Sequence, residues 1–150
     1  MGTDEIAQKA REENQIIKHL LEELLDQIQT RPPAPVSDWL QGLEAKAEAL
    51  CAHLQAYFQI EEEGGFMQPV LEKNPASAKT IEILKEEHAR FIAELKALIH
   101  SIQDTQRIQR TEIDTVCASF KQLIASLRQH EQNENALLQA VFSDDIGTND

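Results

Sequence analysis

The sequence predicts an all-α protein, an antiparallel up-down-up-down bundle of four helices. Leu, Ala, Glu, Gln and Lys, which favour helices, are abundant among the 150 residues. Only 5 Gly and 5 Pro are present, too few for the many turns of an all-β protein. Apolar residues recur every three or four positions over four long stretches with short links. We expect residues 1–150 to form one domain.

Proline and capping residues set the limits of the first two helices. The first helix is expected over about residues 4–30, and the prolines of segment 31–35 end it because proline lacks the N–H that the helix needs. Either Ser37 or Asp38 can cap the second helix, which runs to about Glu63. The two glycines that follow loosen its end and leave room for a short helical continuation.

The third and fourth helices each begin at a recognisable start signal. Asn74-Pro75 combines a cap with proline at the first helical position, and the helix that it starts runs to about Gln103. The segment 111–114, Thr-Glu-Ile-Asp, resembles a capping box and opens the fourth helix. That helix is expected to end near Phe142, followed by a polar tail over residues 143–150.

The charge and the absence of targeting signals exclude several classes of partner. With 14 Lys and Arg against 26 Asp and Glu, the formal net charge is −12. This argues against nucleic acid and against an anionic membrane surface as partners. No apolar run approaches the roughly 20 residues of a membrane span, and no secretory signal is visible. We expect Cys51 and Cys117 to be buried thiols, which fits a reducing cytoplasm.

Two predicted helices carry polar residues on their apolar faces. The stripe of the fourth helix continues onto His130 and Glu134, which lie roughly 60° and 20° from its centre. The stripe of the second helix continues onto Tyr57 and Glu61 with nearly the same two offsets. Because residues four apart share a helix face, His130 and Glu134 can reach a single centre.

The other two helices add to this set. His88 lies near the centre of the third stripe, and Glu13 projects inward from the first helix with Asn14 at the stripe edge. Burying an unpaired carboxylate costs several kcal/mol or forces it to stay protonated. A metal ion is a common explanation, because it neutralises carboxylates and takes imidazoles as ligands.

Simpler explanations exist for each residue taken alone. His88 by itself could be an ordinary core histidine, and an inward glutamate near the end of a bundle can extend to solvent. His19 and His100 fall opposite their apolar stripes and are expected to face solvent. His53 lies on a flank as a potential peripheral partner of the site, and Glu62 is expected to be a solvated charge that could alternatively bind the metal.

Three segments resemble hemerythrin-like (HHE cation-binding) domains. Residues 52–66, AHLQAYFQIEEEGGF, resemble the second helix of that family. Glu87-His88 and residues 130–135, HEQNEN, resemble the third and fourth helices, and residues 145–150 resemble the tail of some bacterial members. The likeness covers nearly the whole chain in order and spacing. It implies a four-helix bundle with a non-haem di-iron centre.

The family's iron ligands are a His on the first helix, HxxxE on the second, His on the third and HxxxE or HxxxD on the fourth. Four positions match: Glu61, His88, His130 and Glu134. Tyr57 stands where the second-helix His is expected, and Asn14, after Glu13, stands where the family often has Glu-His. A Tyr57 phenolate and Glu13 could replace the two imidazoles, with a phenolate favouring ferric iron. Alternatively, one or both metal positions are lost.

Three functions follow from these residues and this resemblance. The first is a non-haem iron-binding protein with a dinuclear centre and a mixed Tyr/His/Glu ligand shell, with another divalent metal as the alternative. It would act in redox or gas sensing, iron handling or peroxide chemistry, with O₂, NO or peroxide as ligands. Glu61 and Glu134 would bridge, and Tyr57, His88 and His130 would be terminal ligands. The second is a metal-free structural or interaction bundle, and the third is an enzyme such as an oxidase or peroxidase with an open metal position.

Overall fold

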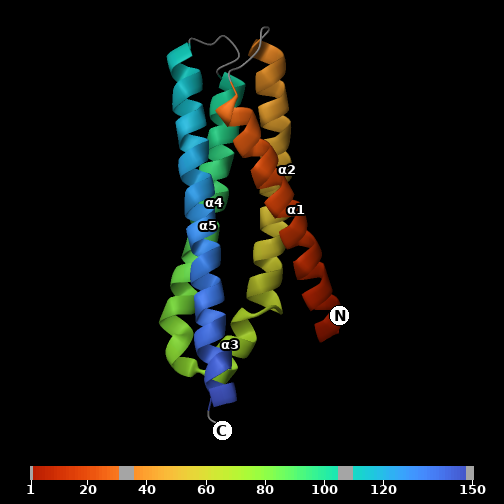
Figure 1. The fold of residues 1–150 in the computed structure, drawn as a ribbon, viewed down its shortest axis with the longest axis vertical. Helices are drawn as coiled ribbons and strands as arrows, with labels where there is room; N and C mark the ends of the chain where they lie inside the picture. The colour runs from red at the N-terminus through yellow and green to blue at the C-terminus, as the bar shows by residue number, and fades with distance from the viewer. Residues whose placement is uncertain (1, 31–35, 105–109, 148–150) are drawn as a thin grey trace.

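A computed structural model describes residues 2–30, 36–104 and 110–147, which form a bundle of four long helices (Figure 1). Neighbouring long helices run in opposite directions, and the two ends of the chain lie toward the same end of the bundle. The described residues contain no strand, so the predicted all-α fold is confirmed. In chain order the elements are α1 (Thr3–Gln29), α2 (Val36–Glu63), α3 (Met67–Lys73), the 3₁₀ turn η1 (Pro75–Ser77), α4 (Ala78–Asp104) and α5 (Arg110–Gly147).

Two apolar clusters fill the bundle. The larger cluster draws on all four long helices, and its fully buried members include Leu24, Leu43, Leu50, Leu95 and Phe120. The smaller cluster lies where α3 crosses the end of the bundle, and its buried members are Met67, Val70, Ile81, Leu84 and Val141. On α4 and α5 the stretch between these two clusters carries buried polar side chains instead of apolar ones. The bundle interior is therefore apolar, polar and apolar in succession.

Two predicted helix starts are wrong. Helix α2 begins at Val36, so Ser37 and Asp38 lie inside its first turn instead of capping it. Val36 packs against the larger cluster, and the Asp38 carboxylate is favoured by the positive end of the helix dipole. Helix α5 begins at Arg110, so Thr111 is already helical. The predicted proline stop at residues 31–35 lies outside the described residues.

The predicted end of the last helix is also wrong. Helix α5 continues five residues beyond Phe142 to Gly147, through much of the expected polar tail. The sequence has no proline or glycine between Phe142 and Gly147, so nothing there interrupts the helix. The Lys73 ammonium also lies 5.7 Å from the centre of the Phe142 ring, which ties α5 to the end of α3. Residues 148–150 lie outside the described part of the chain.

The connection from α2 to α4 follows the predicted signals. The Gly65 N–H donates to the Ile60 carbonyl at 2.7 Å and closes the end of α2, and the short continuation forms the separate helix α3. The Asn74 side chain accepts from the Ala76 N–H at 3.2 Å, with Pro75 in the first position of η1. The 3₁₀ turn η1 leads directly into α4. The predicted start of the third long helix at Asn74-Pro75 is therefore confirmed, and its first turn is a 3₁₀ turn.

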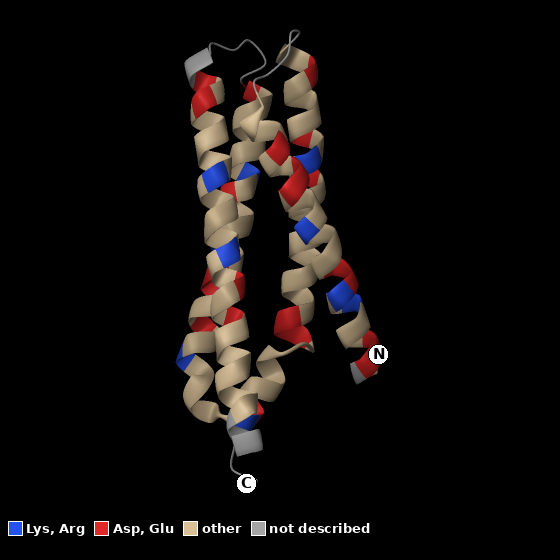
Figure 2. Cartoon of the chain, in the orientation of Figure 1, with Lys and Arg blue, Asp and Glu red and all other residues tan. Residues whose placement is uncertain are grey.

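The surface is charged along the length of the bundle. Acidic side chains, with fewer basic ones among them, lie on every long helix (Figure 2). His19 and His100 are exposed, as their positions on the helical wheel predict. Cys51 is buried and Cys117 is half-buried, and both are free thiols. None of the described helices is both long and apolar enough to cross a membrane.

Two glycines of the α2 region should respond to alanine in opposite directions. A Cβ at Gly65 would lie 2.7 Å from the Ile60 carbonyl oxygen, so Gly65→Ala should lower the free energy of unfolding by about 1–3 kcal/mol. A Cβ at Gly42 would meet only the Gln27 side chain, at 3.5 Å. Gly42→Ala should therefore raise the free energy of unfolding by about 0.5–1 kcal/mol. Urea denaturation measures both, and equal shifts would contradict this account of Gly65.

Candidate metal centre

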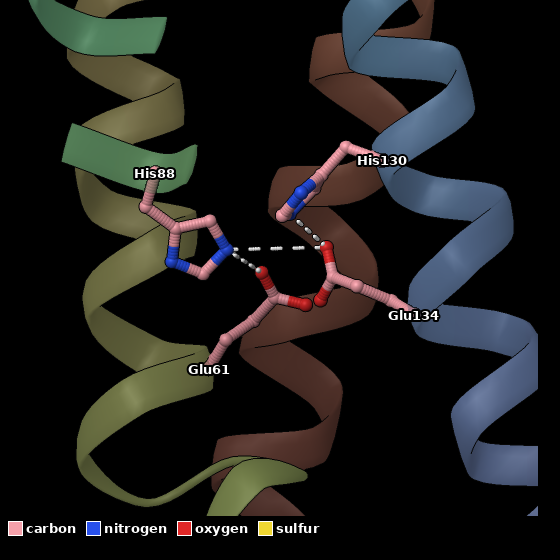
Figure 3. Close-up of side chains that lie close together, drawn as sticks. All are labelled: Glu61, His88, His130 and Glu134. Atoms are coloured by element: carbon pink, nitrogen blue, oxygen red, sulfur yellow. Dashed lines mark ion pairs between the residues drawn. The ribbon is translucent and has the colours of Figure 1, made fainter. Parts of the chain in front are cut away.

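Four buried polar side chains converge in the layer between the two apolar clusters (Figure 3). Glu61 comes from α2, His88 from α4, and His130 and Glu134 from one face of α5. Each side chain offers one nitrogen or oxygen, and these four atoms lie within 4.8 Å of one another. The four residues are 2–5% exposed, so water contributes little to their solvation. We refer to them as the four-residue group.

The inner atoms of this group face one another without forming hydrogen bonds. His88 Nε2 lies 3.3 Å from Glu61 Oε1 and 3.9 Å from Glu134 Oε1, and His130 Nε2 lies 2.6 Å from Glu134 Oε1. Both Nε2 atoms, Glu61 Oε1 and Glu134 Oε2 nevertheless have no hydrogen-bond partner among the described residues. Each buried polar atom left in this state costs about 1–3 kcal/mol. Two imidazoles and two carboxylates are donors that a divalent or trivalent transition-metal ion would satisfy.

The outer nitrogen of each imidazole is held by a further carboxylate. His88 Nδ1 lies 2.9 Å from Glu62 Oε2, and His130 Nδ1 lies 2.9 Å from Glu87 Oε1. In a neutral ring, donation from Nδ1–H leaves the lone pair on Nε2, which is the atom that faces the centre. The two carboxylates thus set both the orientation and the tautomer that metal binding requires.

Aromatic rings fix the planes of the two imidazoles on the side of the larger apolar cluster. The Phe58 ring stacks on His88 with a centroid distance of 3.9 Å and an interplanar angle of 6°. The Phe91 ring meets His130 edge to face, at 5.3 Å and 82°. Neither imidazole can rotate without displacing a buried phenylalanine. These rings also separate the four-residue group from solvent on that side.

Burial and mutual contact divide the protons unequally within the group. Burial raises the pKa of Glu61 to about 9, against the opposing contact with His88. Burial also acts on Glu134, but its contacts with His130 and His88 outweigh burial and lower its pKa to about 2. Burial opposes charge on His88, yet the contacts with Glu134 and Glu61 raise its pKa to about 10. Without a metal, these shifts favour a proton on Glu61 and a cationic His88 that faces an ionised Glu134.

Tyr57 and Glu13, the other two predicted ligands, lie outside the four-residue group. Tyr57 is half-buried and lines a pocket that Glu61 and Glu134 also line. Burial, followed by the charges of these two glutamates, raises the pKa of its hydroxyl. Glu13 does not reach the centre, because its Oε2 atom lies 2.6 Å from Nδ1 of His53 on α2. His53 thus pairs with Glu13, and α1 supplies no residue to the group.

The sequence analysis did not identify the roles of Glu62 and Glu87. Glu62 was expected in solvent or on the metal, and Glu87 was noted only as the neighbour of His88. One signal was present, because each residue is adjacent in sequence to a predicted ligand, Glu61 or His88. Adjacent positions on a helix lie about 100° apart, so such a neighbour points along the flank toward the next helix. Their partners depend on packing between helices, which the sequence pattern does not give.

Comparison with known proteins identifies one family. The family model described as the hemerythrin HHE cation binding domain matches residues 5–142. The match includes the four-residue group and its two outer carboxylates. No curated protein and no solved structure matches the chain.

The outer carboxylates give a testable measure of ligand positioning. Glu87→Ala removes the acceptor for His130 Nδ1–H and should weaken metal binding, with Fe²⁺ as the probe ion, by about 10–100-fold. Glu87→Gln keeps an acceptor oxygen and should recover part of the lost affinity. Glu86→Ala changes an exposed neighbour and serves as the control. The measurement is anaerobic competition with a chelator, and equal affinity in all four proteins would contradict the proposed positioning.

Proposed function

This chain belongs to the hemerythrin HHE cation-binding domain family, and from that membership we propose that it binds one non-haem iron ion. The ligands would be Glu61, His88, His130 and Glu134. The observation that supports this most strongly is the convergence of these four buried side chains, whose inner atoms lack hydrogen-bond partners. Imidazole nitrogens together with carboxylate oxygens are a donor set typical of non-haem iron.

We propose one tightly held ion because α1 offers no ligand to a second. Glu13 is engaged by His53, and Asn14 is not part of the four-residue group. A second ion would depend on Tyr57 and on the remaining oxygens of Glu61 and Glu134, which line the same pocket. Its affinity should therefore be lower than that of the first.

The proposed role is redox or gas sensing through this iron. Bound iron would supply a redox-active centre with affinity for O₂, NO or peroxide. The chain's own residues hold the ligands: Glu62 and Glu87 orient the imidazoles, and Phe58 and Phe91 keep bulk water away. Access for a small molecule is available on the α1 side, where the pocket extends to Glu61 and Glu134.

A metal-free interaction bundle is the second candidate function, and one observation favours it. The raised pKa values of Glu61 and His88 allow the group to balance its charges with protons alone. A bundle that had lost its metal could therefore keep these residues buried. The metal content of the purified protein distinguishes the two candidates.

Protein produced with added iron should contain about one iron per chain after desalting, measured by elemental analysis. Glu61→Ala and Glu134→Ala should each reduce this content several-fold, because each removes a charged ligand. Glu112→Ala, an exposed acidic residue elsewhere on α5, should leave it unchanged. Substoichiometric metal that does not respond to Glu61→Ala or Glu134→Ala would instead support the metal-free bundle.

Direct ligation by Tyr57 has its own signature. If the phenolate binds ferric iron, the Fe³⁺-loaded protein should show a visible charge-transfer band that Tyr57→Phe abolishes without loss of iron. Burial raises the pKa of the Tyr57 hydroxyl, whereas a coordinated cation lowers it and favours the phenolate that gives the band. If the Fe³⁺ protein is colourless and has its full iron content, Tyr57 does not bind the iron and only lines the pocket.

A further inference from the structure

The pocket beside the four-residue group is much larger than a diatomic gas requires. Its volume is about 360 Å³, and it lies between α1, α2 and α5 at the start of the α2–α3 connection. A water molecule occupies about 30 Å³ of liquid, and a cavity of about 150 Å³ in another protein accepts benzene. The pocket therefore has room for an organic molecule with a single ring or a short alkyl chain.

The walls of the pocket are apolar and the α1 side is built from small residues. Ala7 and Ala10 face the pocket from α1, beside Ile6, and the opposite walls include Phe66 and Leu138. The N-terminal half of α1 diverges from α5 (Figure 1), while Ile6 stays close to Gly64 after the end of α2. Small side chains on a diverging helix leave the space open, so an apolar body can enter it without displacing the core.

Carboxyl groups predominate among the polar groups of the pocket. The carboxylates of Glu61, Glu131 and Glu134 line it together with Tyr57 and Asn135, whereas no Lys, Arg or His does so. Glu134 Oε2 is buried without a hydrogen-bond partner among the described residues. Where a carboxyl group of the pocket is ionised, it only accepts hydrogen bonds and repels anions. A matching ligand therefore donates a hydrogen bond and carries no negative charge.

We propose that this pocket binds a small organic molecule with an apolar, ring-sized body and a hydroxyl or amino group directed at the carboxylates. This goes beyond iron binding and does not depend on which metal is bound. A hydroxyl and an amino ligand have the same chemistry here, because each places a hydrogen-bond donor on an apolar body. Both features follow from the lining: apolar walls from α1 and α3, and acceptors from α2 and α5.

The test uses Tyr57 as a reporter, because it is the only tyrosine in the chain. Ring-labelled tyrosine gives an NMR signal from this residue alone. Benzyl alcohol, benzylamine, toluene and benzoate are titrated into the full chain at pH 7, as purified and again after metal removal. Benzyl alcohol and benzylamine should give saturable shifts and bind at least about threefold more tightly than toluene. Benzoate should not bind.

Pocket-filling variants locate the binding. Ala10→Phe and Ala7→Phe place a ring in the pocket from two positions on α1 and should abolish the shifts. Ala89→Phe places the same ring in a separate pocket on the α2–α4 side of His88 and should leave binding unchanged. Far-ultraviolet circular dichroism checks that each variant remains helical.

Four outcomes of the titrations and variants would overturn the proposal, and a fifth comes from metal removal. They are no saturable shift with any compound, benzoate binding as tightly as benzyl alcohol, toluene binding as tightly as benzyl alcohol, and equal loss in Ala89→Phe and Ala10→Phe. Binding that disappears on metal removal would also overturn it, since the compounds would then be metal ligands. Iron content is measured on the same samples, so a failure of iron binding is separate from a failure of the pocket.

Discussion

The burial of two carboxylates and two imidazoles in one layer of the bundle is the constraint on which the rest of the structure depends. Ionised groups in such a place are stable only when their charges balance. Without metal, a proton on Glu61 and the pairing of cationic His88 with Glu134 achieve this balance. A divalent ion that replaced these two protons would leave the total charge of the layer unchanged. The same layer is therefore compatible with a folded metal-free protein and with a metal site.

Two carboxylates outside that layer maintain its geometry, each in the same way, by contacting an imidazole on the next helix. Glu62, which follows Glu61 on α2, holds His88 on α4, and Glu87, which precedes His88, holds His130 on α5. Each outer carboxylate is thus adjacent in sequence to one member of the four-residue group and in contact with another. A displacement of one helix would disturb two members together. Helices α2, α4 and α5 are coupled in this way, whereas α1 is not.

Helical periodicity explains why much of this arrangement could be predicted from the sequence. The apolar stripes fix which face of each helix is buried, so the burial of Glu61, His88, His130 and Glu134 follows from their positions. Periodicity does not fix which side chain meets which across an interface. Glu13 was therefore expected at the centre, although His53 holds it elsewhere. The extension of α5 to Gly147 was missed because polar residues were taken as the end of a helix that no proline or glycine interrupts.

The departures from the family pattern and the pocket lie on the same side of the bundle. Asn14 is on α1, Tyr57 lines the pocket, and the wall that α1 contributes is made of Ile6, Ala7 and Ala10. The four residues that match the family pattern come from α2, α4 and α5, where the outer carboxylates and phenylalanines hold them. Because no member of the four-residue group lies on α1, the divergence of its N-terminal half from α5 displaces none of them. In the proposed one-iron site no second metal occupies the space beside Tyr57, and the proposed organic ligand would use this same space. On this view a weaker second metal position and the apolar pocket have the same structural origin.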